Sequence, residues 1–364
     1  MKFRSEQGIL AEALGALARV ATSRNSPTPT MSGVKLSLDK DTLTVVSADN
    51  DVSLQFSIPV GGERDGSSLI NARLLNDIVR AMPTGAVQVD VTTEAAKLSG
   101  GRSQFTVPVL SVHDFPRMPA STANPVTMNA KDLARALTQV VYAAGKDPSR
   151  QNLTAVLLEA ESSGLRLVAT DGFRLAVRDL VGAEILVTGR QCLLPSRALN
   201  ELQRLLDGSE EISIRFGDIE ATFENETMQL TTRIVNADFP QYRHLIKSNY
   251  PNKLVVDREA LLEALRRCRV LVDDDNTPVR LTMSTDGLRL TVQSRDQGTS
   301  VEDVDAEYNG EELTVAFNPG RLREGVEALT SSTVSIESVD NKVAALITGV
   351  GDPTYLYVLM PQRI

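Results

Sequence analysis

Three stretches of the chain share one alternation of hydrophobic and polar residues around a polar corner, which is the pattern of a β-hairpin. The stretches are residues 35–47, 157–169 and 280–293. The first leucines after the corners, Leu43, Leu165 and Leu288, are 122 and 123 residues apart. A period this constant indicates a repeated structural unit, so we expect three copies of one module.

Each module also contains two segments with the 3.6-residue period of an amphipathic helix. The apolar stripe of the first helix is Leu10, Leu14 and Leu17, then Leu133, Leu137 and Val140, then Leu261, Leu265 and Cys268. The second helix is predicted at 71–82, 195–206 and 318–329, and an alternating strand follows it at 87–91, 212–216 and 334–338. These elements predict an α+β fold, with three tandem repeats of a two-helix domain whose sheet is mainly antiparallel.

Similar endings delimit the three modules. Asp114-Phe115-Pro116, Asp238-Phe239-Pro240 and Leu359-Met360-Pro361 each close a strand. We therefore expect domain 1 at residues 1–118, domain 2 at 126–243 and domain 3 at 252–364. The segments near 117–128 and 241–256, which contain Pro, Asn and Thr, are expected to be linkers.

The middle hairpin differs from its two copies after residue 169. Asp-Gly between apolar alternations favours a tight corner, here at Thr170-Asp171-Gly172, because Gly adopts a positive φ without a Cβ clash. The stretch Thr170–Leu175, which contains this corner and continues with Phe173 and Arg174, has no counterpart in the other modules. A difference confined to one copy is expected where that copy has been adapted to bind a partner.

The strand-rich modules leave sheet edges that invite another strand. Neighbouring modules can pair edge to edge, but the outer edges of the first and third modules stay free. A second copy of the chain can satisfy those edges, and head-to-tail pairing that closes produces a ring. The period and the edges leave the number of chains in the ring open.

The composition is that of a globular protein, with 42% hydrophobic and 23% charged residues. No apolar run approaches the ~18 residues that span a bilayer. The start of the chain, Met1-Lys-Phe-Arg-Ser-Glu, lacks the apolar stretch of a signal peptide. We expect a cytoplasmic protein with no membrane partner.

Few residues are suited to catalysis or metal binding. The chain has two cysteines and two histidines. No nucleophile motif accompanies His113-Asp114, and the run Asp273-Asp-Asp275 lacks the Gly and the spaced oxygen ligands of a calcium loop. Cys268 occupies a core position of the first helix. We predict no catalytic site, no metal and no cofactor.

The charges are unevenly distributed along the chain, and this affects what the net charge implies about partners. A formal net charge of −9 argues against a nucleic-acid partner. The six predicted helices nevertheless sum to +4, with at least one Arg on each, and the rest of the chain sums to −13. A solvated face is the commoner explanation for one such helix. If helices line a ring, however, their weak phosphate contacts without base recognition suit a protein that slides on DNA.

Five stretches are similar to one known family. They are Met1-Lys-Phe3, Gly101-Arg-Ser-Gln-Phe105, Val168-Ala-Thr-Asp-Gly-Phe-Arg-Leu-Ala-Val177, Asp238-Phe-Pro-Gln-Tyr242 and Val358-Leu-Met-Pro-Gln-Arg-Ile364. In this order and over the whole length, the chain resembles the bacterial sliding clamps, the β subunits of DNA polymerase III.

The resemblance implies a fold and a function. Three clamp domains per chain would close as a head-to-tail dimeric ring with its helices inside, encircling duplex DNA without sequence specificity. As a non-catalytic processivity factor, the homodimer would tether the replicative polymerase alpha subunit, the clamp loader, other polymerases and repair proteins.

The resemblance also assigns residues. The partner-peptide pocket would comprise Leu153, Thr170, Gly172, Phe173, Arg174, Leu175, Pro240, Leu245, Val358, Met360, Pro361 and Arg363. DNA would contact Arg24, Arg73, Arg80, Arg197 and Arg204. The dimer interface would contain Phe105, Val270, Leu271 and Glu302.

Four positions depart from the family pattern. Phe173 stands where some members have His, Gln362 where some have Met, Gln151 where some have Tyr, and Leu74 where Lys occurs. We expect a shifted preference for partner peptides, weaker DNA contact by the loop before Leu153, and one fewer intersubunit ion pair.

Two alternatives remain open at this stage. Taken without the resemblance, Leu153, Leu175, Pro240 and Leu245 are ordinary core residues, and the chain could be a protein-only interaction scaffold that ignores DNA. The third hypothesis is an enzyme whose active site the motifs do not reveal.

Overall fold

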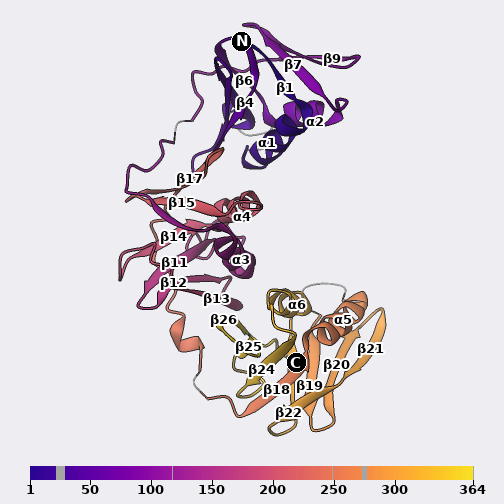
Figure 1. Ribbon diagram of the computed structural model, residues 1–364. Helices are drawn as coiled ribbons and strands as arrows, with labels where there is room; N and C mark the ends of the chain where they lie inside the picture. The colour runs from indigo at the N-terminus through magenta and orange to yellow at the C-terminus, as the bar shows by residue number, and fades with distance from the viewer. Residues whose placement is uncertain (22–28, 117, 248, 273–276, 364) are drawn as a thin grey trace. The chain divides into compact units, whose positions relative to one another are not determined.

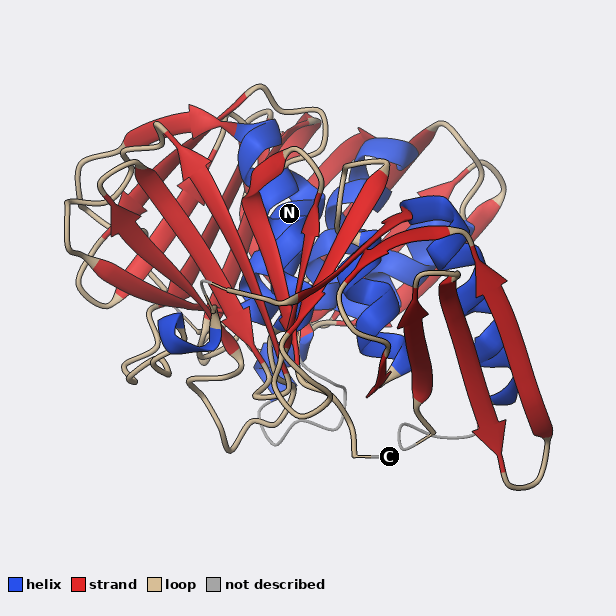
Figure 2. Cartoon of the chain, turned by 90° about the horizontal axis from the view of Figure 1, so that it is seen from below, coloured by secondary structure: helices blue, strands red, loops and turns tan. Residues whose placement is uncertain are grey.

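The computed structural model describes residues 1–364 except 22–28, 117, 248, 273–276 and 364 (Figure 1). Arg24 and the run Asp273–Asp275 therefore lie outside the described residues. The chain's contacts divide it into two compact units, residues 1–131 with 204–234 and residues 132–203 with 235–364. Strands make up most of the regular structure, as Figure 2 shows. Among the described helices, none combines the length and the hydrophobicity that crossing a bilayer requires.

The first unit contains two antiparallel sheets. Their orders are β5-β1-β7-β8-β9 and β10-β15-β16-β17-β4-β3-β2-β6. The strands are β1 (Lys2–Glu6), β2 (Gly33–Asp39), β3 (Thr42–Ala48), β4 (Val52–Pro59), β5 (Gly61–Arg64), β6 (Gly66–Asn71), β7 (Ala86–Val91), β8 (Ala95–Gly100), β9 (Ser103–Pro108), β10 (Val126–Asn129), β15 (Glu211–Phe216), β16 (Glu220–Glu224) and β17 (Met228–Arg233). The helices α1 (Gln7–Val20) and α2 (Ala72–Ala81) pack against each other, and a short 3-10 turn, η1 (Pro29–Ser32), precedes β2.

The second unit contains the other two antiparallel sheets. Their orders are β14-β11-β12-β13-β26-β25-β24-β18-β22 and β21-β20-β19-β23. The strands are β11 (Ala155–Glu161), β12 (Gly164–Thr170), β13 (Arg174–Val181), β14 (Gln191–Pro195), β18 (Asn252–Asp257), β19 (Val279–Ser284), β20 (Gly287–Ser294), β21 (Gly298–Val304), β22 (Ala306–Asn309), β23 (Leu313–Phe317), β24 (Thr333–Ser338), β25 (Ala345–Gly349) and β26 (Asp352–Leu359).

Most helical residues after α2 lie in this second unit. The α-helices are α3 (Ala130–Val140) and α4 (Ser196–Leu205), each cut near one end by the division, and α5 (Arg258–Cys268) and α6 (Pro319–Glu327). Three 3-10 turns, η2 (Val141–Ala143), η3 (Arg243–Leu245) and η4 (Arg269–Leu271), complete the list. Helix α5 packs on α6 and on β20 and β21.

Helices lie at the segments where the sequence predicted them, and local chemistry explains where two of them, α2 and α6, begin. Asn71 caps α2 by accepting a hydrogen bond from Leu74 N at 3.0 Å, and Asn318 caps α6 in the same way from Arg321 N at 2.9 Å. An Asn side chain in this position satisfies an N–H group that has no partner within the helix. The apolar stripes are buried as expected, with Leu14, Leu137 and Leu261 each 0% exposed.

The three predicted hairpins are also confirmed, at β2–β3, β11–β12 and β19–β20. Edge-to-edge pairing of distant segments joins strands into longer sheets within each unit. In the first unit β17 pairs with β4, and in the second β13 pairs with β26. Strand β9 ends one sheet and β21 ends another, so each has one side without a paired strand among the described residues.

The expected linkers are shorter than the sequence indicated. Strand β10 begins at Val126 and pairs with β15, and strand β18 begins at Asn252 and pairs with both β24 and β22. Polar residues such as Asn252 made these segments look like linkers in the sequence. In the structure, the Asn252 side chain donates to the carbonyls of Ser338 and Val339, which ties the start of β18 to the end of β24.

Both cysteines are buried and unpaired. Burial raises the pKa of Cys192 to about 12, and burial likewise raises the pKa of Cys268. Both side chains are therefore protonated thiols at neutral pH, which agrees with a core role for Cys268.

Gly325 on α6 lies directly against Tyr357 of β26, whose side chain is 0% exposed. A Cβ at position 325 would overlap the tyrosine ring. Ala normally stabilises a helix interior by about 1 kcal/mol over Gly. Overpacking of a core costs about 1–3 kcal/mol. The steric cost of the added methyl group therefore outweighs the gain in helix propensity, and the net change in the free energy of unfolding is a loss.

We expect Gly325→Ala to destabilise the protein and to lower the midpoint of urea unfolding. The matched control is Gly8→Ala in α1, where an added Cβ meets nothing within 4 Å. That control should unfold at the original midpoint or slightly above it. An unchanged midpoint for Gly325→Ala would contradict the packing described here.

Candidate functional site

The pairing of β13 with β26 brings the distinctive corner at residues 170–173, between β12 and β13, beside the end of the chain. Leu175 lies opposite Val358 in this register, and Arg174 lies opposite Leu359. The pairing continues one step further, because Met360 N donates to Phe173 O at 2.9 Å. The residues predicted from 170–175 and from 358–360 are therefore neighbours in space.

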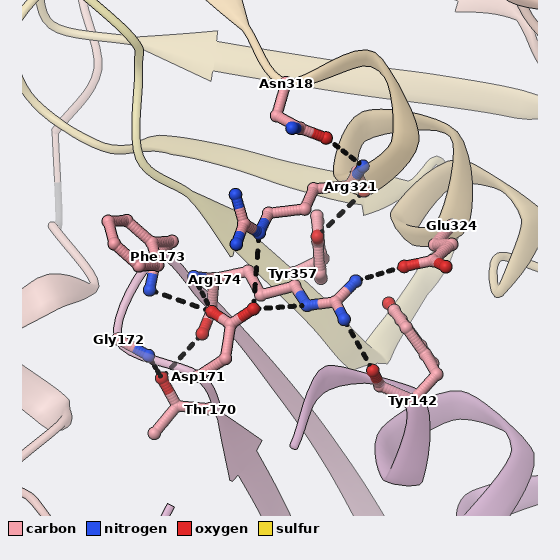
Figure 3. A network of polar contacts seen from close by, with 10 residues as sticks. All are labelled: Tyr142, Thr170, Asp171, Gly172, Phe173, Arg174, Asn318, Arg321, Glu324 and Tyr357. Carbon is pink, nitrogen blue, oxygen red and sulfur yellow. Dashed lines mark hydrogen bonds and ion pairs between the residues drawn. The ribbon is translucent and has the colours of Figure 1, made fainter. Parts of the chain in front are cut away.

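The corner itself is held by side chains that bond the local backbone (Figure 3). Asp171 Oδ1 accepts from Phe173 N at 2.9 Å and from Arg174 N at 3.0 Å. Thr170 Oγ1 donates to Arg174 O at 2.6 Å and accepts from Gly172 N at 3.1 Å. Gly172 has φ +89°, as the Asp-Gly pair predicted. The corner consequently has a defined shape that presents Phe173 outward.

Two large apolar residues that lie opposite each other at the end of the β13–β26 pairing are exposed. Phe173 is 56% exposed and Met360 is 39% exposed. Folded proteins rarely leave adjacent large hydrophobic groups in water without a reason, so this pair is a candidate contact surface.

Other predicted pocket residues lie beneath the surface. Leu175 and Val358 are 1% and 2% exposed and belong to one buried apolar cluster, with the half-buried Leu245 packed against it. Their burial shows that they are core residues. They therefore lie beneath the exposed Phe173 and Met360 and are not themselves on the surface. Pro240 and Arg363 are exposed, and Pro361 is half-buried.

Tyr242 anchors the segment that carries Pro240 and Leu245. Its hydroxyl donates to Glu159 Oε2 at 2.9 Å, and Leu245 N donates to Tyr242 O at 2.9 Å. Burial raises the pKa of Tyr242 to about 12, so the phenol stays protonated and can donate. The segment is thereby fixed to the sheet.

A buried arginine connects the corner to helix α6 (Figure 3). Arg174, only 8% exposed, forms an ion pair with Glu324 and donates from Nη2 to Tyr142 O at 2.7 Å. Its Nε lies 3.2 Å from Asp171 Oδ2, close enough for an ion pair but without hydrogen-bond geometry. Its guanidinium carbon is 5.2 Å from the centre of the Tyr142 ring.

Burial by itself lowers the pKa of Arg174, but Tyr357, Glu324 and Asp171 outweigh that effect and raise the pKa. The guanidinium is therefore charged, and its partners compensate the cost of desolvation. Burial raises the pKa of Tyr142, which stays a neutral hydroxyl.

Arg321 forms the outer part of the same network. Its Nε lies 3.2 Å from Asp171 Oδ2, and its guanidinium carbon lies 4.8 Å from the centre of the Phe173 ring. A cation at that distance from an aromatic face is attracted to it. The exposed Phe173 ring is thus held in place by an arginine from α6.

A cavity of about 460 Å³ adjoins this network. Residues of three segments line it, at 144–153, 171–174 and 318–324. Three predicted pocket residues, Leu153, Phe173 and Arg174, are among them.

The sequence assigned no individual site role to Asp171, Arg321 or Glu324. Asp171 was predicted as a turn residue within the distinctive stretch 170–175, and the other two were counted as helix charges. The three-residue spacing of Arg321 and Glu324 places them on one face of α6, but nothing in the sequence tells which partner that face meets.

The predicted DNA-binding arginines within the described residues are exposed on two helices. Arg73 and Arg80 lie on α2, and Arg197 and Arg204 lie on α4. Arg80 Nε donates to Asn76 Oδ1 at 2.9 Å, which orients it along the helix. Arg24 is outside the described residues. Gln151 is exposed, and Asn152 donates to Asp238 O at 3.2 Å.

The predicted interface residues lie at or near two of the sheet-edge strands, β9 and β21. Phe105 of β9 is 38% exposed, and Val270 of η4 is 76% exposed. Leu271 is half-buried, as is Leu74 on α2. Glu302 of β21 pairs with Arg267, whose Nη2 is 2.8 Å from Glu302 Oε2.

Within the part of the chain that the structure describes, no group of three or more His, Cys, Asp or Glu side chains is arranged to hold a metal ion.

Family models of the DNA polymerase III beta subunit match almost the whole chain. The N-terminal domain matches residues 1–119, the central domain 127–241 and the C-terminal domain 243–363. The chain is also 31% identical to the beta sliding clamp of Streptomyces coelicolor and 33% identical to that of Synechococcus elongatus. Both matches cover 100% of each chain.

Solved structures agree. The DNA polymerase III subunit beta of Pseudomonas aeruginosa superposes with a TM-score of 0.89 at 27% identity, and each chain is covered to 100%. The Thermotoga maritima beta subunit has a TM-score of 0.91 at 23% identity, covering 100% of this chain and 99% of the other, and supports the fold. The architecture is the three-domain sliding-clamp fold, mixed α and β with mostly sheet. The chain therefore belongs to the family of the DNA polymerase III beta subunits, the beta sliding clamps, which are non-catalytic processivity factors of bacterial DNA replication.

Proposed function

We propose that this chain acts as a head-to-tail homodimeric ring that encircles duplex DNA, with two helices of each domain turned inward. Its domains would be residues 1–118, 126–243 and 252–364, boundaries supported by the ranges of the three family matches. Bacterial chromosomes are replicated in the cytoplasm, where we place the protein.

The observation that carries the ring is that two of the sheet-edge strands, β9 and β21, have the predicted interface residues at or near them. Strands β9 and β21 each have one side without a paired strand among the described residues, and exposed Phe105 and Val270 lie at or near these edges. An open edge readily pairs with another chain. Because the two edges lie at opposite ends of the sequence, pairing β9 of one copy with β21 of another is head to tail, and it closes when a ring forms.

Exposed arginines on the helices support DNA binding. Arg73, Arg80, Arg197 and Arg204 project from α2 and α4, and the family resemblance adds Arg24. Arginine contacts to phosphates provide affinity that does not depend on base sequence. Duplex DNA inside a ring is then retained by topology and can slide.

The partner pocket would form around the corner and the end of the chain. Exposed Phe173 and Met360, with Leu153 on the adjoining cavity wall, give an apolar surface, and Met adapts its shape to different ligands. The other members are Thr170, Gly172, Arg174, Leu175, Pro240, Leu245, Val358, Pro361 and Arg363. A Pseudomonas aeruginosa clamp with 27% identity has been solved bound to griselimycin, which supports ligand binding by this fold.

The ligands of this pocket would be short extended peptides with a Leu or Phe anchor. They would come from the replicative polymerase alpha subunit, the clamp loader, other polymerases and repair proteins. A protein-only scaffold is not favoured, because the full-length relatives are sliding clamps.

The ring can be tested by its dependence on DNA topology. Clamp loaded by its clamp loader onto nicked circular DNA should remain bound through gel filtration. After one restriction cut it should slide off the ends, because nothing but the closed circle retains it. Linear DNA with bulky blocks at both ends is the control and should retain the clamp. Equal retention on open linear and circular DNA would contradict encirclement.

The pocket can be tested at the end of the chain. Deletion of residues 360–364 should abolish binding of a labelled peptide with a Leu-Phe anchor in fluorescence anisotropy, since Met360 is removed. The sedimentation coefficient should stay that of the dimer, because the predicted interface residues are untouched.

Gln362→Ala provides the matched control for that deletion. It keeps the main-chain hydrogen bond from Gln362 N to Ala316 O, which is 2.8 Å long, and it should retain most of the peptide affinity. Unaltered affinity in the deletion variant would show that peptides bind elsewhere.

A further inference from the structure

The eight methionines of the chain differ widely in their access to water, and all of them lie within the described residues. Four are buried, with at most 8% of the residue exposed, and three are half-buried. Met360 is the exposed one, at 39%. The buried ones are Met1, Met82, Met228 and Met283, and the half-buried ones are Met31, Met118 and Met128.

The main chain holds residue 360 at the surface from both sides. Met360 N donates to Phe173 O at 2.9 Å, and two residues later Gln362 N donates to Ala316 O at 2.8 Å. The preceding residue, Leu359, is 0% exposed and pairs with a strand on each side. Because successive side chains of an extended segment point to opposite sides, the burial of Leu359 directs Met360 outward. The thioether cannot turn into the core unless these hydrogen bonds break.

An accessible thioether has a characteristic reaction with peroxides. A lone pair on the sulfur attacks one peroxide oxygen, the O–O bond breaks, and an S–O bond forms. The second oxygen leaves as water, so the sulfur is oxidised by two electrons and the peroxide is reduced. The product is methionine sulfoxide, which is polar and chiral, whereas the thioether is apolar.

The two thiols of the chain do not compete for the peroxide. Cys192 and Cys268 are buried, and burial raises the pKa of both. Peroxides react with the thiolate form of cysteine, which is scarce at neutral pH under these conditions. Oxidation of a thioether needs no loss of a proton. Met360 is therefore the sulfur that a peroxide in solution encounters first.

The position of Met360 gives this reaction a consequence for binding. Met360 lies opposite the exposed Phe173 at the end of the β13–β26 pairing, and the two residues form the exposed apolar part of the proposed partner pocket. A bound peptide would gain from burying the thioether against its anchor. A sulfoxide would have to lose its hydration instead, which costs free energy. The free protein pays no such cost, because the side chain is already in water.

We propose that Met360 is a modification site through which peroxides regulate the partner pocket. Hydrogen peroxide or an organic hydroperoxide converts the Met360 thioether to the sulfoxide, which weakens binding of partner peptides and leaves the fold and the dimer intact. Methionine sulfoxide reductases, which remove the oxygen at the expense of a thiol, restore binding. This proposal rests on the proposed peptide pocket and adds a redox control to it.

The site of reaction can be mapped on the full-length protein. Hydrogen peroxide is added, samples are quenched over time, and tryptic peptides are examined by mass spectrometry. The peptide 343–363 contains Met360 as its single methionine, and it should gain one oxygen atom before any other methionine does. A saturating peptide with a Leu-Phe anchor should slow this gain, because it covers the thioether. Faster oxidation of another methionine would contradict the assignment.

The effect on binding is measured with the same labelled peptide by fluorescence anisotropy. Oxidised protein should bind about tenfold more weakly, since the apolar contact of one methionine is lost. Its sedimentation coefficient and its midpoint of urea unfolding should be those of the untreated protein. Treatment with the A and B reductases together, one for each sulfoxide epimer, should restore the original affinity.

Two variants separate Met360 from the other methionines. Met360→Leu has no thioether at this position, so its affinity, whatever its starting value, should be the same before and after peroxide. The matched control is Met118→Leu, which removes a half-buried thioether of the first unit and should keep the full sensitivity to peroxide. An equal loss of affinity in Met360→Leu would show that peroxide acts elsewhere and would overturn the proposal.

The remaining outcomes distinguish the redox control from the pocket itself. If Met360 is oxidised and the affinity does not change, the pocket stands and the redox control is wrong. If oxidation lowers the unfolding midpoint or dissociates the dimer, the loss of binding is structural damage and the proposal is also wrong. If the untreated protein does not bind the peptide, the proposed pocket fails, and its redox control fails with it.

Discussion

An unpaired strand edge exposes a row of N–H and C=O groups, and this chain satisfies two such edges with strands from a distant part of its own sequence. β17 pairs with β4 and β13 pairs with β26. Each pairing turns separate hairpins into one long sheet, with 8 strands in the first unit and 9 in the second. The candidate site depends directly on the second pairing, because Leu175 and Val358 become neighbours only when β13 and β26 are in register.

The corner next to the β13–β26 pairing contains the charge of the site whose burial costs the most desolvation energy, that of Arg174. A guanidinium that is 8% exposed, as in Arg174, is stable only when its partners replace water well. Asp171, Glu324 and the carbonyl of Tyr142 do so from three separate segments. Because one of these segments is helix α6, the shape of the corner and the position of the helix are linked. An exposed, ordered Phe173 is the consequence at the surface.

Charge in this protein has to be considered locally. A net charge of −9 conceals an excess of positive charge on the helices. It also conceals a cavity that four cations and three carboxylates line.

The sequence by itself determined the local elements. Alternation placed the hairpins at β2–β3, β11–β12 and β19–β20, and the helical period placed the buried stripes, because both signals come from residues close together in the chain. Asn71 and Asn318 marked two helix starts through bonds within three residues. The Asp-Gly corner followed from the backbone freedom of Gly172 alone.

Only the tertiary structure decided which of these elements meet. The pairing of Arg174 with Glu324 spans 150 residues, and no periodicity encodes it. Burial of Leu175 and Val358, the cation over the Phe173 ring, and the extension of β10 and β18 into the expected linkers all depend on partners supplied by other segments. The physical reason is that hydrogen bonds and packing across a sheet or between a corner and a helix are properties of two surfaces, and the sequence specifies each surface separately.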